Sequence, residues 1–334
     1  MQKKIKVGIV GAAGYTGGEL IRLLIHHPNT EIIFAHSKSN FGKKIYEVHT
    51  DLLGDTEMIF SEKLDSTIDV LFLCLGHGES KKFLSGNNIS SSIKIIDLSQ
   101  DFRIKSDENI FNSQFSTFNW TYGLPELNRE KIKNSEFNIA NPGCFATCIQ
   151  LALLPLANAG LIKNEVHASA TTGSTGAGQS LSETSHFSWR NNNLSTYKNF
   201  EHQHLFEINQ SIKQLQNSFD QPINFIPHRG NFTRGIFATV YTKCDLNETD
   251  AIKLFENYYA SHPFVHVSKN NIDLKQVVNT NKCFLFIEKK VNKIIITSII
   301  DNLIKGASGQ ALQNMNLLFG LEETAGLNLK PSAF

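Results

Sequence analysis

Short apolar runs alternate with amphipathic segments through the first 143 residues. Runs of strand length stand at 5–10, 31–35, 68–75, 93–97 and 137–140. The segment at 19–25 has the period of a helix and ends before a proline. Because strands that alternate with helices are typical of a parallel sheet with helices on both faces, we predict an α/β, Rossmann-like domain at residues 1–143.

The pattern changes after residue 143. Helices are predicted from residue 144 and at 249–259, and strand patterns stand at 165–172, 236–241, 277–278, 284–287 and 294–300. Strands that cluster without regular intervening helices favour a mostly antiparallel sheet covered by helices on one side. We therefore expect an α+β catalytic domain at 144–303, and a closing helix within 304–334 that returns to the first domain.

A glycine-rich loop joins the first predicted strand to the first predicted helix. Its glycines follow the spacing G-x-x-G-x-x-G from Gly11. Such glycines let the backbone approach a pyrophosphate, and the helix start carries a matching partial charge. A tight turn without a ligand is the alternative, but the position between strand and helix favours a dinucleotide site. The predicted cofactor contacts here are Gly11, Ala13, Gly14, Tyr15, Thr16 and Gly17.

The end of the second strand bears on the choice between NAD and NADP. An NAD site usually carries Asp or Glu there, to hold the ribose 2′-hydroxyl. Ser37, Lys38 and Ser39 stand there instead, and hydroxyls with a lysine suit a 2′-phosphate. We predict NADP(H), with a solvated polar loop as the alternative. Gly76, after the run at 68–75, is a further predicted cofactor contact because loops at the carboxyl ends of parallel strands face the cofactor.

Cys144 stands where Pro142 and Gly143 end a strand pattern and an apolar helix begins. A thiol in the first turn of a helix lies near unpaired N–H groups and the positive end of the dipole, which favour the thiolate. Cys144 is therefore a candidate nucleophile. A buried thiol that merely starts the helix is the alternative, and the local sequence does not decide between them.

Two further segments are candidate anion sites. Arg103 can hold a substrate phosphate or carboxylate, or it can pair with Asp101 on the surface. The loop at 173–178 is rich in glycine and hydroxyls, and its backbone N–H groups can form an anion nest around Ser174 and Gly176. A flexible linker is the alternative for this loop. The segment at 122–126 is predicted to be a turn.

His202 and His204 stand at the start of a helix pattern. Because they are two residues apart, we expect them to point in different directions, which is poor geometry for a shared metal. One of them can act as general acid and base while the other holds the substrate or a structural hydrogen bond. The sequence does not say which does so, and no metal site is predicted.

Composition and charge exclude several classes of partner. The 32 Lys and Arg residues nearly balance 31 Asp and Glu residues, and the net charge of +1 gives no field that recruits nucleic acid or an anionic membrane. No apolar run reaches the length of a membrane span. The five cysteines lack the spacing of a disulfide framework, which favours reduced thiols. We predict a cytoplasmic protein that acts on a small molecule.

Seven stretches, in order along almost the whole chain, resemble the N-acetyl-γ-glutamyl-phosphate reductases, a family of the semialdehyde dehydrogenase superfamily. They are GIVGAAGYTGGEL at 8–20, IDLSQDFR at 96–103, YGLPELNR at 122–129, NPGCFAT at 141–147, TTGSTGAGQ at 171–179, HQH at 202–204 and DNLIKGASGQALQNMN at 301–316. NPGC-x-x-T together with YGLPELNR is specific to the family. The chain departs from the family at Phe206, where a proline is common before the glutamate, and at Gln179, where arginine is commoner.

The resemblance implies the NADPH-dependent reduction of N-acetyl-γ-glutamyl phosphate to N-acetyl-glutamate 5-semialdehyde, a step of arginine biosynthesis. It implies that the Cys144 thiolate attacks the acyl phosphate, that phosphate leaves, and that hydride reduces the resulting thioester while His204 or His202 moves the protons. It also implies that Asn302 and Gly306 lie by the nicotinamide, and that the chain forms a catalytic and dimerisation domain in a homodimer or homotetramer. The candidates for the substrate's anionic groups are Arg103, Ser174 and Gly176.

Several alternatives stay open at this point. An aspartate-semialdehyde dehydrogenase has the same fold, cysteine and cofactor, but it takes a shorter substrate and lacks YGLPELNR. The amino group of the substrate can carry an acetyl group, a succinyl group or a carrier protein. A regulator that binds NADP without turnover belongs to another class, and a cysteine hydrolase would leave the first glycine loop without a purpose.

Overall fold

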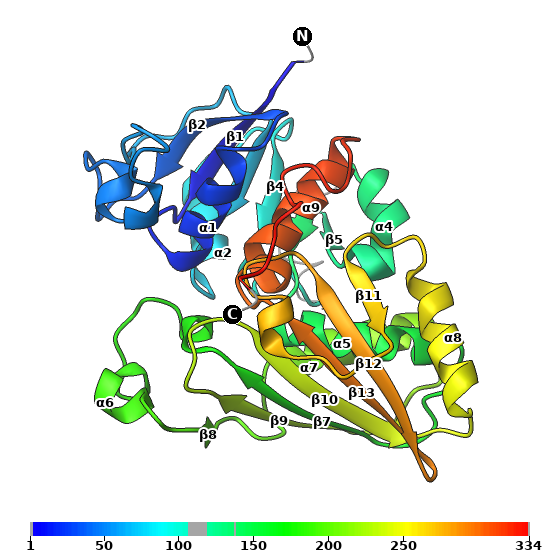
Figure 1. The fold of residues 1–334 in the computed structure, drawn as a ribbon. Coiled ribbons are helices and arrows are strands. Elements are labelled where there is room, and N and C mark those ends of the chain that lie inside the picture. The colour runs from blue at the N-terminus through cyan, green and yellow to red at the C-terminus, as the bar shows by residue number, and fades with distance from the viewer. Residues whose placement is uncertain (1–2, 106–118, 137, 333–334) are drawn as a thin grey trace. The chain divides into compact units, whose positions relative to one another are not determined.

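The computed structural model describes residues 3–105, 119–136 and 138–332. The chain divides into two compact units, which we call the first unit (residues 1–142 and 307–328) and the second unit (residues 143–306 and 329–334). Each unit is built on its own β-sheet (Figure 1).

The first unit contains a parallel sheet. Its strands, in spatial order over the described residues, are β2 (Thr30–His36), β1 (Ile5–Val10), β3 (Val70–Leu73), β4 (Lys94–Asp97), β6 (Asn138–Ala140) and β5 (Trp120–Tyr122). Each neighbouring pair runs parallel. Because β1 lies between β2 and β3, the sheet is extended to one side of β1 and then to the other. This is the predicted doubly wound arrangement, and it places a topological switch point at the carboxyl ends of β1 and β3. Phe137, the first residue of the last predicted strand, lies outside the described residues.

Both faces of this sheet are covered. Leu84 packs in one core cluster with Leu71 and Leu73, whereas Val70 and Phe72 alternate with them and are also buried. Among the described residues, the helices of this unit are α1 (Tyr15–Leu24), α2 (Glu79–Gly86), α4 (Pro125–Lys133) and α9 (Gly309–Leu318), with short 3₁₀ turns η1 (Ile45–Glu47) and η2 (Thr50–Leu52). Helix α9 contacts α1 and α4.

Residues 122–126 are not the simple turn that was predicted. Strand β5 ends at Tyr122, and α4 begins at Pro125. A proline in the first turn of a helix has a preset φ and lacks only an N–H group that would have no intrahelical acceptor. The proline therefore marks a helix start here, which a reading as a turn missed.

The second unit contains a mixed sheet. In spatial order over the described residues, its strands are β11 (Val265–Ser268), β12 (Cys283–Lys290), β13 (Lys293–Ile300), β10 (Ile236–Lys243), β7 (Val166–Thr172), β9 (Ile223–Arg229) and β8 (Ser195–Thr196). Pairing is antiparallel from β12 through β13 and β10 to β7, and between β9 and β8. The pairs β11–β12 and β7–β9 are parallel. Among the described strands, four of the six neighbouring pairs are therefore antiparallel, and the sheet is mostly antiparallel, as predicted.

Helices cover one face of the second sheet, as predicted. Helix α5 (Cys144–Asn158) lies on β13 and β10 and contacts α7 (His204–Leu215) and α8 (Glu248–Tyr259). Along β10, Ala238 and Val240 are buried, whereas Phe237, Thr239 and Tyr241, which alternate with them, are only partly buried. The remaining short elements are η3 (Ser174–Ala177), η4 (Glu183–Ser185), α6 (Phe187–Arg190), η5 (Leu274–Gln276) and a π-helix at Ile304–Ser308.

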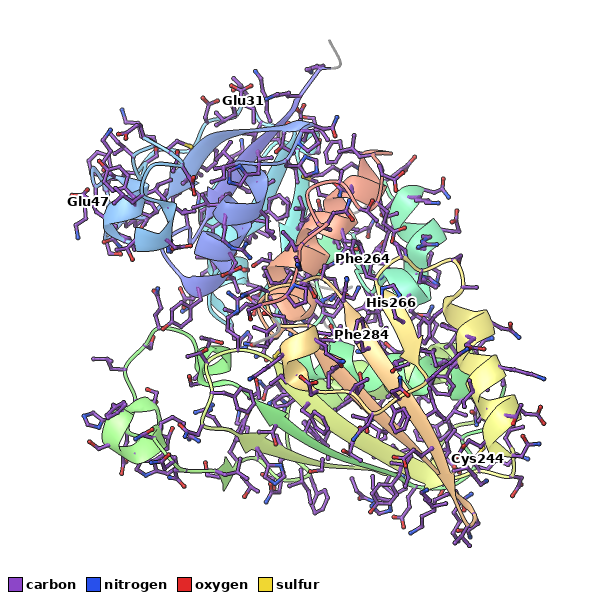
Figure 2. All side chains as sticks on the ribbon, viewed as in Figure 1. Glu31, Glu47, Cys244, Phe264, His266 and Phe284 are labelled. Carbon is purple, nitrogen blue, oxygen red and sulfur yellow. The ribbon has the colours of Figure 1, made fainter. Side chains whose placement is uncertain are left out.

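The other face is partly covered by the segment around Val277. Val277 lies in a turn after η5 and packs with Ile272 and Ile299, so the strand predicted at 277–278 is wrong. Two adjacent apolar residues indicate burial but carry no period that separates a strand from a buried turn. At the sheet edge, His266 of β11 and Phe284 of β12 are partners in register, with ring centroids 5.6 Å apart (Figure 2).

Among the described residues, we find no helix that combines the length and the apolar character required to cross a bilayer.

Candidate active site

Cys144 is the first residue of α5. Gly143 caps the helix with an extended backbone (φ −73°, ψ 154°), and its carbonyl accepts the first helical hydrogen bond from Thr147 N–H at 2.8 Å. Cys144 is partly exposed, whereas the other four cysteines are buried, and none of the five forms a disulfide. Its thiol is therefore reachable at the positive end of a long apolar helix.

Glycines bring two other segments against Cys144. A Cβ on Gly143 would lie 2.3 Å from Nε2 of His204, and a Cβ on Gly306 would lie 2.8 Å from the Cβ of Cys144. Neither position has room for a larger side chain. The imidazole of His204 and the π-helix that carries Gly306 consequently approach the helix start closely.

Glu207 connects His204 to the cap of α5. One of its oxygens accepts the Gly143 N–H at 2.9 Å, and the other lies 4.0 Å from Nε2 of His204. Both side chains are buried. The sequence analysis did not single out Glu207, although its position three residues after His204 places it on the same helix face.

The rings of His202 and His204 contact each other, with centroids 4.5 Å apart and planes at 71°. The prediction that they point in different directions is wrong because α7 begins only at His204, so helical spacing does not apply to His202. Nδ1 of His202 accepts the backbone N–H of His204 at 3.2 Å. The His202 ring also meets Phe145, Phe225 and Tyr197 edge-on.

The second glycine-rich loop is held by backbone hydrogen bonds. The N–H groups of Ser174 and Thr175 donate to the carbonyls of Phe232 and Thr233, and the N–H of Gly176 donates to Gly173. These groups already have acceptors, so the predicted backbone anion nest at Ser174 and Gly176 is wrong, and the loop is not a flexible linker either. The side chain of Ser174 is partly exposed and Gly176 is exposed.

Asn302 and Asp301 hold in place the segment that leads into the π-helix. Oδ1 of Asn302 accepts the Gly235 N–H at 2.6 Å, and its Nδ2 donates to Oγ1 of Thr175 at 3.0 Å. Asp301 forms a buried ion pair with Arg234 and accepts the N–H groups of two residues that follow it. Single π-turns often mark functional positions, and this one presents Gly306 to Cys144.

The first glycine-rich loop, in the first unit, is tightly constrained. Gly11 has φ +78°, and a Cβ there would lie 2.2 Å from the carbonyl oxygen of Cys74. A Cβ on Gly17 would lie 2.6 Å from the carbonyl oxygen of Gly11. Ala13 and Thr16 are partly exposed and Tyr15 is exposed. Gly14 caps α1, whose first turn has N–H groups without intrahelical acceptors, so the loop fits a pyrophosphate.

The end of β2 lacks a carboxylate. Ser37 is buried, Lys38 and Ser39 are exposed, and no Asp or Glu occurs from residue 32 to residue 46. Gly76 follows β3, where its carbonyl accepts the N–H of Glu79 at 3.1 Å. These positions lie at the carboxyl ends of parallel strands, where a dinucleotide binds in folds of this kind.

Arg103 is buried rather than on the surface. Its guanidinium donates to the carbonyls of Asn141 at 2.8 Å and Leu98 at 2.7 Å. It therefore joins the segments that follow β4 and β6. Nearby, burial raises the pKa of Asp97 to about 6, against hydrogen bonds from Ser80 and Ser99 and the charge of Arg103, which lower it.

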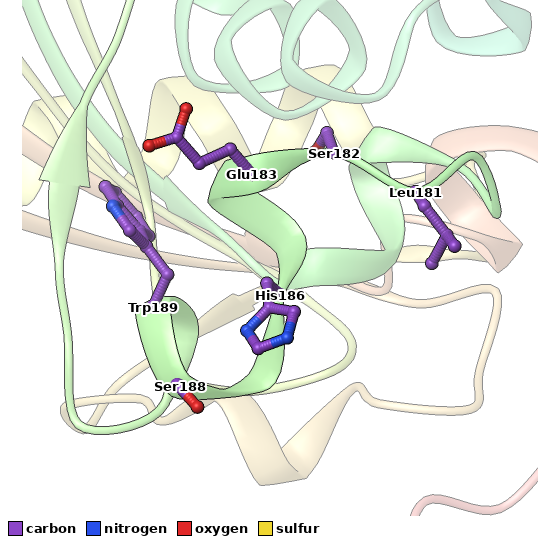
Figure 3. Close-up of a pocket in the computed structure, with 6 residues that line it drawn as sticks. All are labelled: Leu181, Ser182, Glu183, His186, Ser188 and Trp189. Atoms are coloured by element: carbon purple, nitrogen blue, oxygen red, sulfur yellow. The ribbon is translucent and has the colours of Figure 1, made fainter.

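A cavity of about 680 Å³ lies in the segment before β8. It is lined by Leu181, Ser182, Glu183, His186, Ser188 and Trp189 (Figure 3). None of the predicted site residues lines it, and it contains no cysteine. We therefore place the candidate active site at Cys144 and not in this cavity. In the described part of the chain, no three His, Cys, Asp or Glu side chains gather closely enough to hold a metal ion.

Comparison with known proteins decides the family. A model of the NAD binding domain of semialdehyde dehydrogenases matches residues 6–135, and a model of their dimerisation domain matches residues 144–302. A protein of Flavobacterium johnsoniae named N-acetyl-γ-glutamyl-phosphate reductase is 58% identical over 330 residues, which cover 99% of this chain and 100% of that protein. One of Phocaeicola vulgatus with the same name is 57% identical, with the same coverage. The chain belongs to the N-acetyl-γ-glutamyl-phosphate reductase family.

Solved structures share the fold of this reductase family member at low sequence identity. Aspartate semialdehyde dehydrogenase II from Vibrio cholerae has a TM-score of 0.70 at 15% identity and covers 96% of this chain and 99% of its own. Aspartate semialdehyde dehydrogenase from Candida albicans, solved with NADP, has a TM-score of 0.68 at 13% identity, with 95% and 99% covered. These likenesses confirm the predicted fold, and the membership confirms the resemblance found in the seven sequence stretches.

Proposed function

We propose that the chain reduces N-acetyl-γ-glutamyl phosphate, or its N-succinyl counterpart, to the corresponding 5-semialdehyde with NADPH and releases phosphate. Membership of the N-acetyl-γ-glutamyl-phosphate reductase family supports the reaction class. The observation that carries the proposal is the arrangement at the start of α5, where Cys144 is partly exposed and His204 packs on the preceding glycine.

The first unit is proposed to hold NADPH, which supplies the hydride. Gly11 and Gly17 let the loop approach the pyrophosphate, and the first turn of α1 offers N–H groups to it. Lys38, with the hydroxyls of Ser37 and Ser39, suits the 2′-phosphate because residues 32–46 carry no Asp or Glu in the place of the acidic residue that usually holds an NAD ribose.

Cys144 is proposed as the nucleophile. Its sulfur forms a bond to the acyl carbon of the substrate, the bond from that carbon to the phosphate oxygen breaks, and the phosphate leaves with the electron pair. The resulting thioester is the form that accepts hydride. The absence of a side chain on Gly306 keeps space beside the sulfur for the acyl group.

His204 is proposed as the acid and base, with His202 as a positioning residue. His204 lies against Gly143 beside the nucleophile, and a Glu207 oxygen lies 4.0 Å from its Nε2, so the carboxylate can orient the ring that moves the proton of the developing alkoxide. Nδ1 of His202 is occupied by the His204 N–H, and its ring lies among aromatic side chains. His202 therefore fixes the start of α7, where His204 stands.

The remaining predicted residues are proposed to act around this pair. The Ser174 hydroxyl is proposed to bind the substrate phosphate, and the exposed Gly176 has no side chain to obstruct it. Asn302 and Gly306 are proposed contacts of the nicotinamide. Arg103 is proposed to hold the segments that follow β4 and β6 in place. The match of residues 144–302 to a dimerisation domain supports a homodimer or homotetramer.

The test is a coupled assay that follows the nicotinamide absorbance with the acetylated substrate, for the wild type, Cys144→Ala and Cys148→Ala. Cys148 is the matched control because it lies one turn along the same helix and is fully buried. Removing a covalent nucleophile is expected to lower the rate at least about 10³-fold, while NADPH binding is retained. We expect Cys148→Ala to stay within about tenfold of the wild type.

Three outcomes would contradict the proposal. Cys144→Ala could turn over as fast as the wild type, which excludes the thioester. Aspartate semialdehyde could be the better substrate in the reverse direction, which favours the related dehydrogenase. The wild type could bind NADPH and show no turnover on any of these substrates, which favours a regulator.

A further inference from the structure

Arg229, the last residue of β9, brings a positive charge close to the candidate active site. Its guanidinium carbon lies 4.9 Å from the centroid of the Tyr197 ring. The Tyr197 ring in turn meets the ring of His202, with centroids 5.8 Å apart. His202 contacts His204, so two rings separate Arg229 from the proposed acid and base.

Arg190 places a second guanidinium beside Arg229. Its Nη1 donates to the carbonyl of Arg229 at 2.6 Å, and its Nε and Nη2 donate to the carbonyl of Thr184 at 3.2 and 3.1 Å. Arg190 is buried, and its donors are occupied by fixed oxygens. It therefore holds the end of β9. Its positive charge also repels the charge of Arg229, and this repulsion is relieved when an anion binds.

Neither arginine has an anionic partner in the described part of the chain. Nη1 of Arg229 donates to the hydroxyl of Thr184 at 3.3 Å, and its buried Nε has no hydrogen-bond partner there. The hydrogen bonds of Arg190 go to carbonyls and to the Ser195 hydroxyl. Two neighbouring guanidinium groups without a carboxylate are costly unless an anion binds.

Tyr197 does not supply that anion. Burial, and next the negative charge of Cys144, raise the pKa of Tyr197 to about 12, so the phenol is neutral near pH 7. Glu183, the carboxylate nearest to Arg190 along the chain, is exposed on the wall of the cavity in Figure 3.

We propose that Arg229, held in place by Arg190, is an anion subsite that binds a carboxylate of the substrate whose acyl carbon Cys144 attacks. This inference rests on the proposed function. The phosphate is bonded to the carbon that Cys144 attacks, whereas Arg229 lies beyond His202 and Tyr197, so a more distant anionic group fits better. That group is the α-carboxylate of the glutamyl unit or the terminal carboxylate of a dicarboxylic N-acyl group such as succinyl.

The test measures binding directly by calorimetry, so it does not depend on turnover. The probes are N-acetyl-glutamate and N-succinyl-glutamate, and the proteins are the wild type, Arg229→Met, Arg229→Lys and Lys198→Met. Lys198 is the matched control because it is an exposed cation next to Tyr197. Loss of a charge-assisted hydrogen bond is expected to weaken binding to Arg229→Met roughly 10- to 100-fold, with partial recovery in Arg229→Lys and no change in Lys198→Met.

The two probes distinguish the two carboxylates. An equal loss for both probes assigns the subsite to the α-carboxylate, and a loss confined to N-succinyl-glutamate assigns it to the acyl carboxylate. The folding of Arg229→Met is compared with that of the wild type by circular dichroism and thermal unfolding. If Arg229→Met does not fold, the test uses Arg229→Lys, which retains the charge but loses the planar guanidinium. Steady-state assays in the reverse direction should show a raised KM for the semialdehyde, an unchanged KM for inorganic phosphate and kcat within about threefold.

The subsite is excluded if Arg229→Met binds both probes as tightly as the wild type does. It is also excluded if only the KM for inorganic phosphate rises, because the anion is then the phosphate. A change in the mass of the assembly in Arg229→Met, with unchanged probe binding, would mean that a second copy of the chain supplies the carboxylate. A wild type that binds the probes through Arg229 but reduces no substrate would refute the proposed reaction and leave the subsite standing.

Discussion

The two glycine-rich loops of this protein have similar compositions but are built for different tasks. In the first unit, Gly11 and Gly17 lie so close to neighbouring backbone carbonyls that neither position has room for a Cβ, and the loop ends in the first turn of α1. In the second unit, Gly173 also has no room for a Cβ, but the N–H groups of Ser174 and Thr175 are taken by the turn at residues 232–233. The first loop therefore offers N–H donors to a ligand, and the second offers hydroxyls.

The difference comes from the surroundings of each loop. A helix leaves the N–H groups of its first turn without acceptors, so the loop before α1 can hold an anion. The loop after β7 lies beside the entry to β10, and the neighbouring strand connection supplies carbonyl acceptors at once. Glycine content alone does not predict an anion site. A loop can bind an anion only where its backbone N–H groups do not already donate to carbonyls of the protein.

The largest expected effect is on stability in the first loop, from Gly11→Ala. The new Cβ would lie 2.2 Å from a carbonyl oxygen at a residue with φ +78°, so strain and a clash combine. We expect the free energy of unfolding to fall by about 4 kcal/mol, measured by urea denaturation without cofactor. Gly14→Ala is the matched control, since its Cβ has no neighbour closer than 3.5 Å, and it should stay within about 1 kcal/mol. Equal losses in both variants would contradict the close-approach argument.

A second prediction concerns the buried carboxyl at the end of β4 in the first unit. The pKa of Asp97 is raised from 3.8 to about 6, so the folded chain holds this proton more tightly than the unfolded chain. Its contribution to stability is complete below pH 4 and is lost as the pH rises through 6. Relative to Asp97→Asn, the wild type should lose about 2 kcal/mol between pH 4 and pH 7.

The measurement for Asp97 is urea denaturation of both proteins at four pH values from 4 to 7. Asp65→Asn is the control, because the Asp65 carboxyl is exposed and its pKa is lowered by the backbone N–H of Thr67. A lowered pKa affects stability only as the pH falls below the ordinary carboxyl range, so this variant should run parallel to the wild type above pH 4. Parallel curves for Asp97→Asn as well would show that Asp97 titrates normally.

A third prediction concerns the second loop, at Gly173→Ala. Its Cβ would lie 2.4 Å from the Thr233 carbonyl oxygen, but the backbone at Gly173 is extended and Thr233 is exposed. The turn can shift outward, so we expect a loss of about 2 kcal/mol in urea denaturation, smaller than for Gly11→Ala. Gly176→Ala, which meets only a side-chain hydroxyl at 3.2 Å, should lose less than about 1 kcal/mol. If Gly173→Ala lost more free energy of unfolding than Gly11→Ala, the second loop, and not the first, would be the more tightly constrained of the two.

The sequence predicted the first unit better than the second for a physical reason. Buried parallel strands such as β3 are continuous apolar runs, and the glycine loop between β1 and α1 is local, so both can be read from neighbouring residues. The position of Cys144 at the start of a helix was predicted for the same reason, because the residues that end a strand and begin a helix are neighbours in the sequence. The seven stretches that resemble a family then supplied the reaction that local patterns left open.

The surroundings of Cys144 could not be predicted in this way. Glu207 accepts the Gly143 N–H, Tyr197 meets the His202 ring and Arg229 lies over the Tyr197 ring. The three residues come from segments that share no period, and their contacts form only in the folded chain. The placement of His202 was missed because the helix begins two residues later than its pattern suggested. Rules of spacing within an element say nothing about residues that stand just before it.

The smallest effect separates two neighbouring hydroxyls of the second loop. In the described structure, the Thr175 hydroxyl donates to the Thr233 carbonyl at 2.6 Å and accepts from Asn302 at 3.0 Å, whereas the partly exposed Ser174 hydroxyl makes no hydrogen bond. Thr175→Val should therefore lower the free energy of unfolding by about 1 to 2 kcal/mol. Ser174→Ala should leave stability unchanged and raise the KM for inorganic phosphate about fivefold in the reverse reaction, because its hydroxyl is available to the substrate. If Ser174→Ala changed stability and not KM, the second loop would be only a structural connection, and the contrast with the first loop would be greater than we propose.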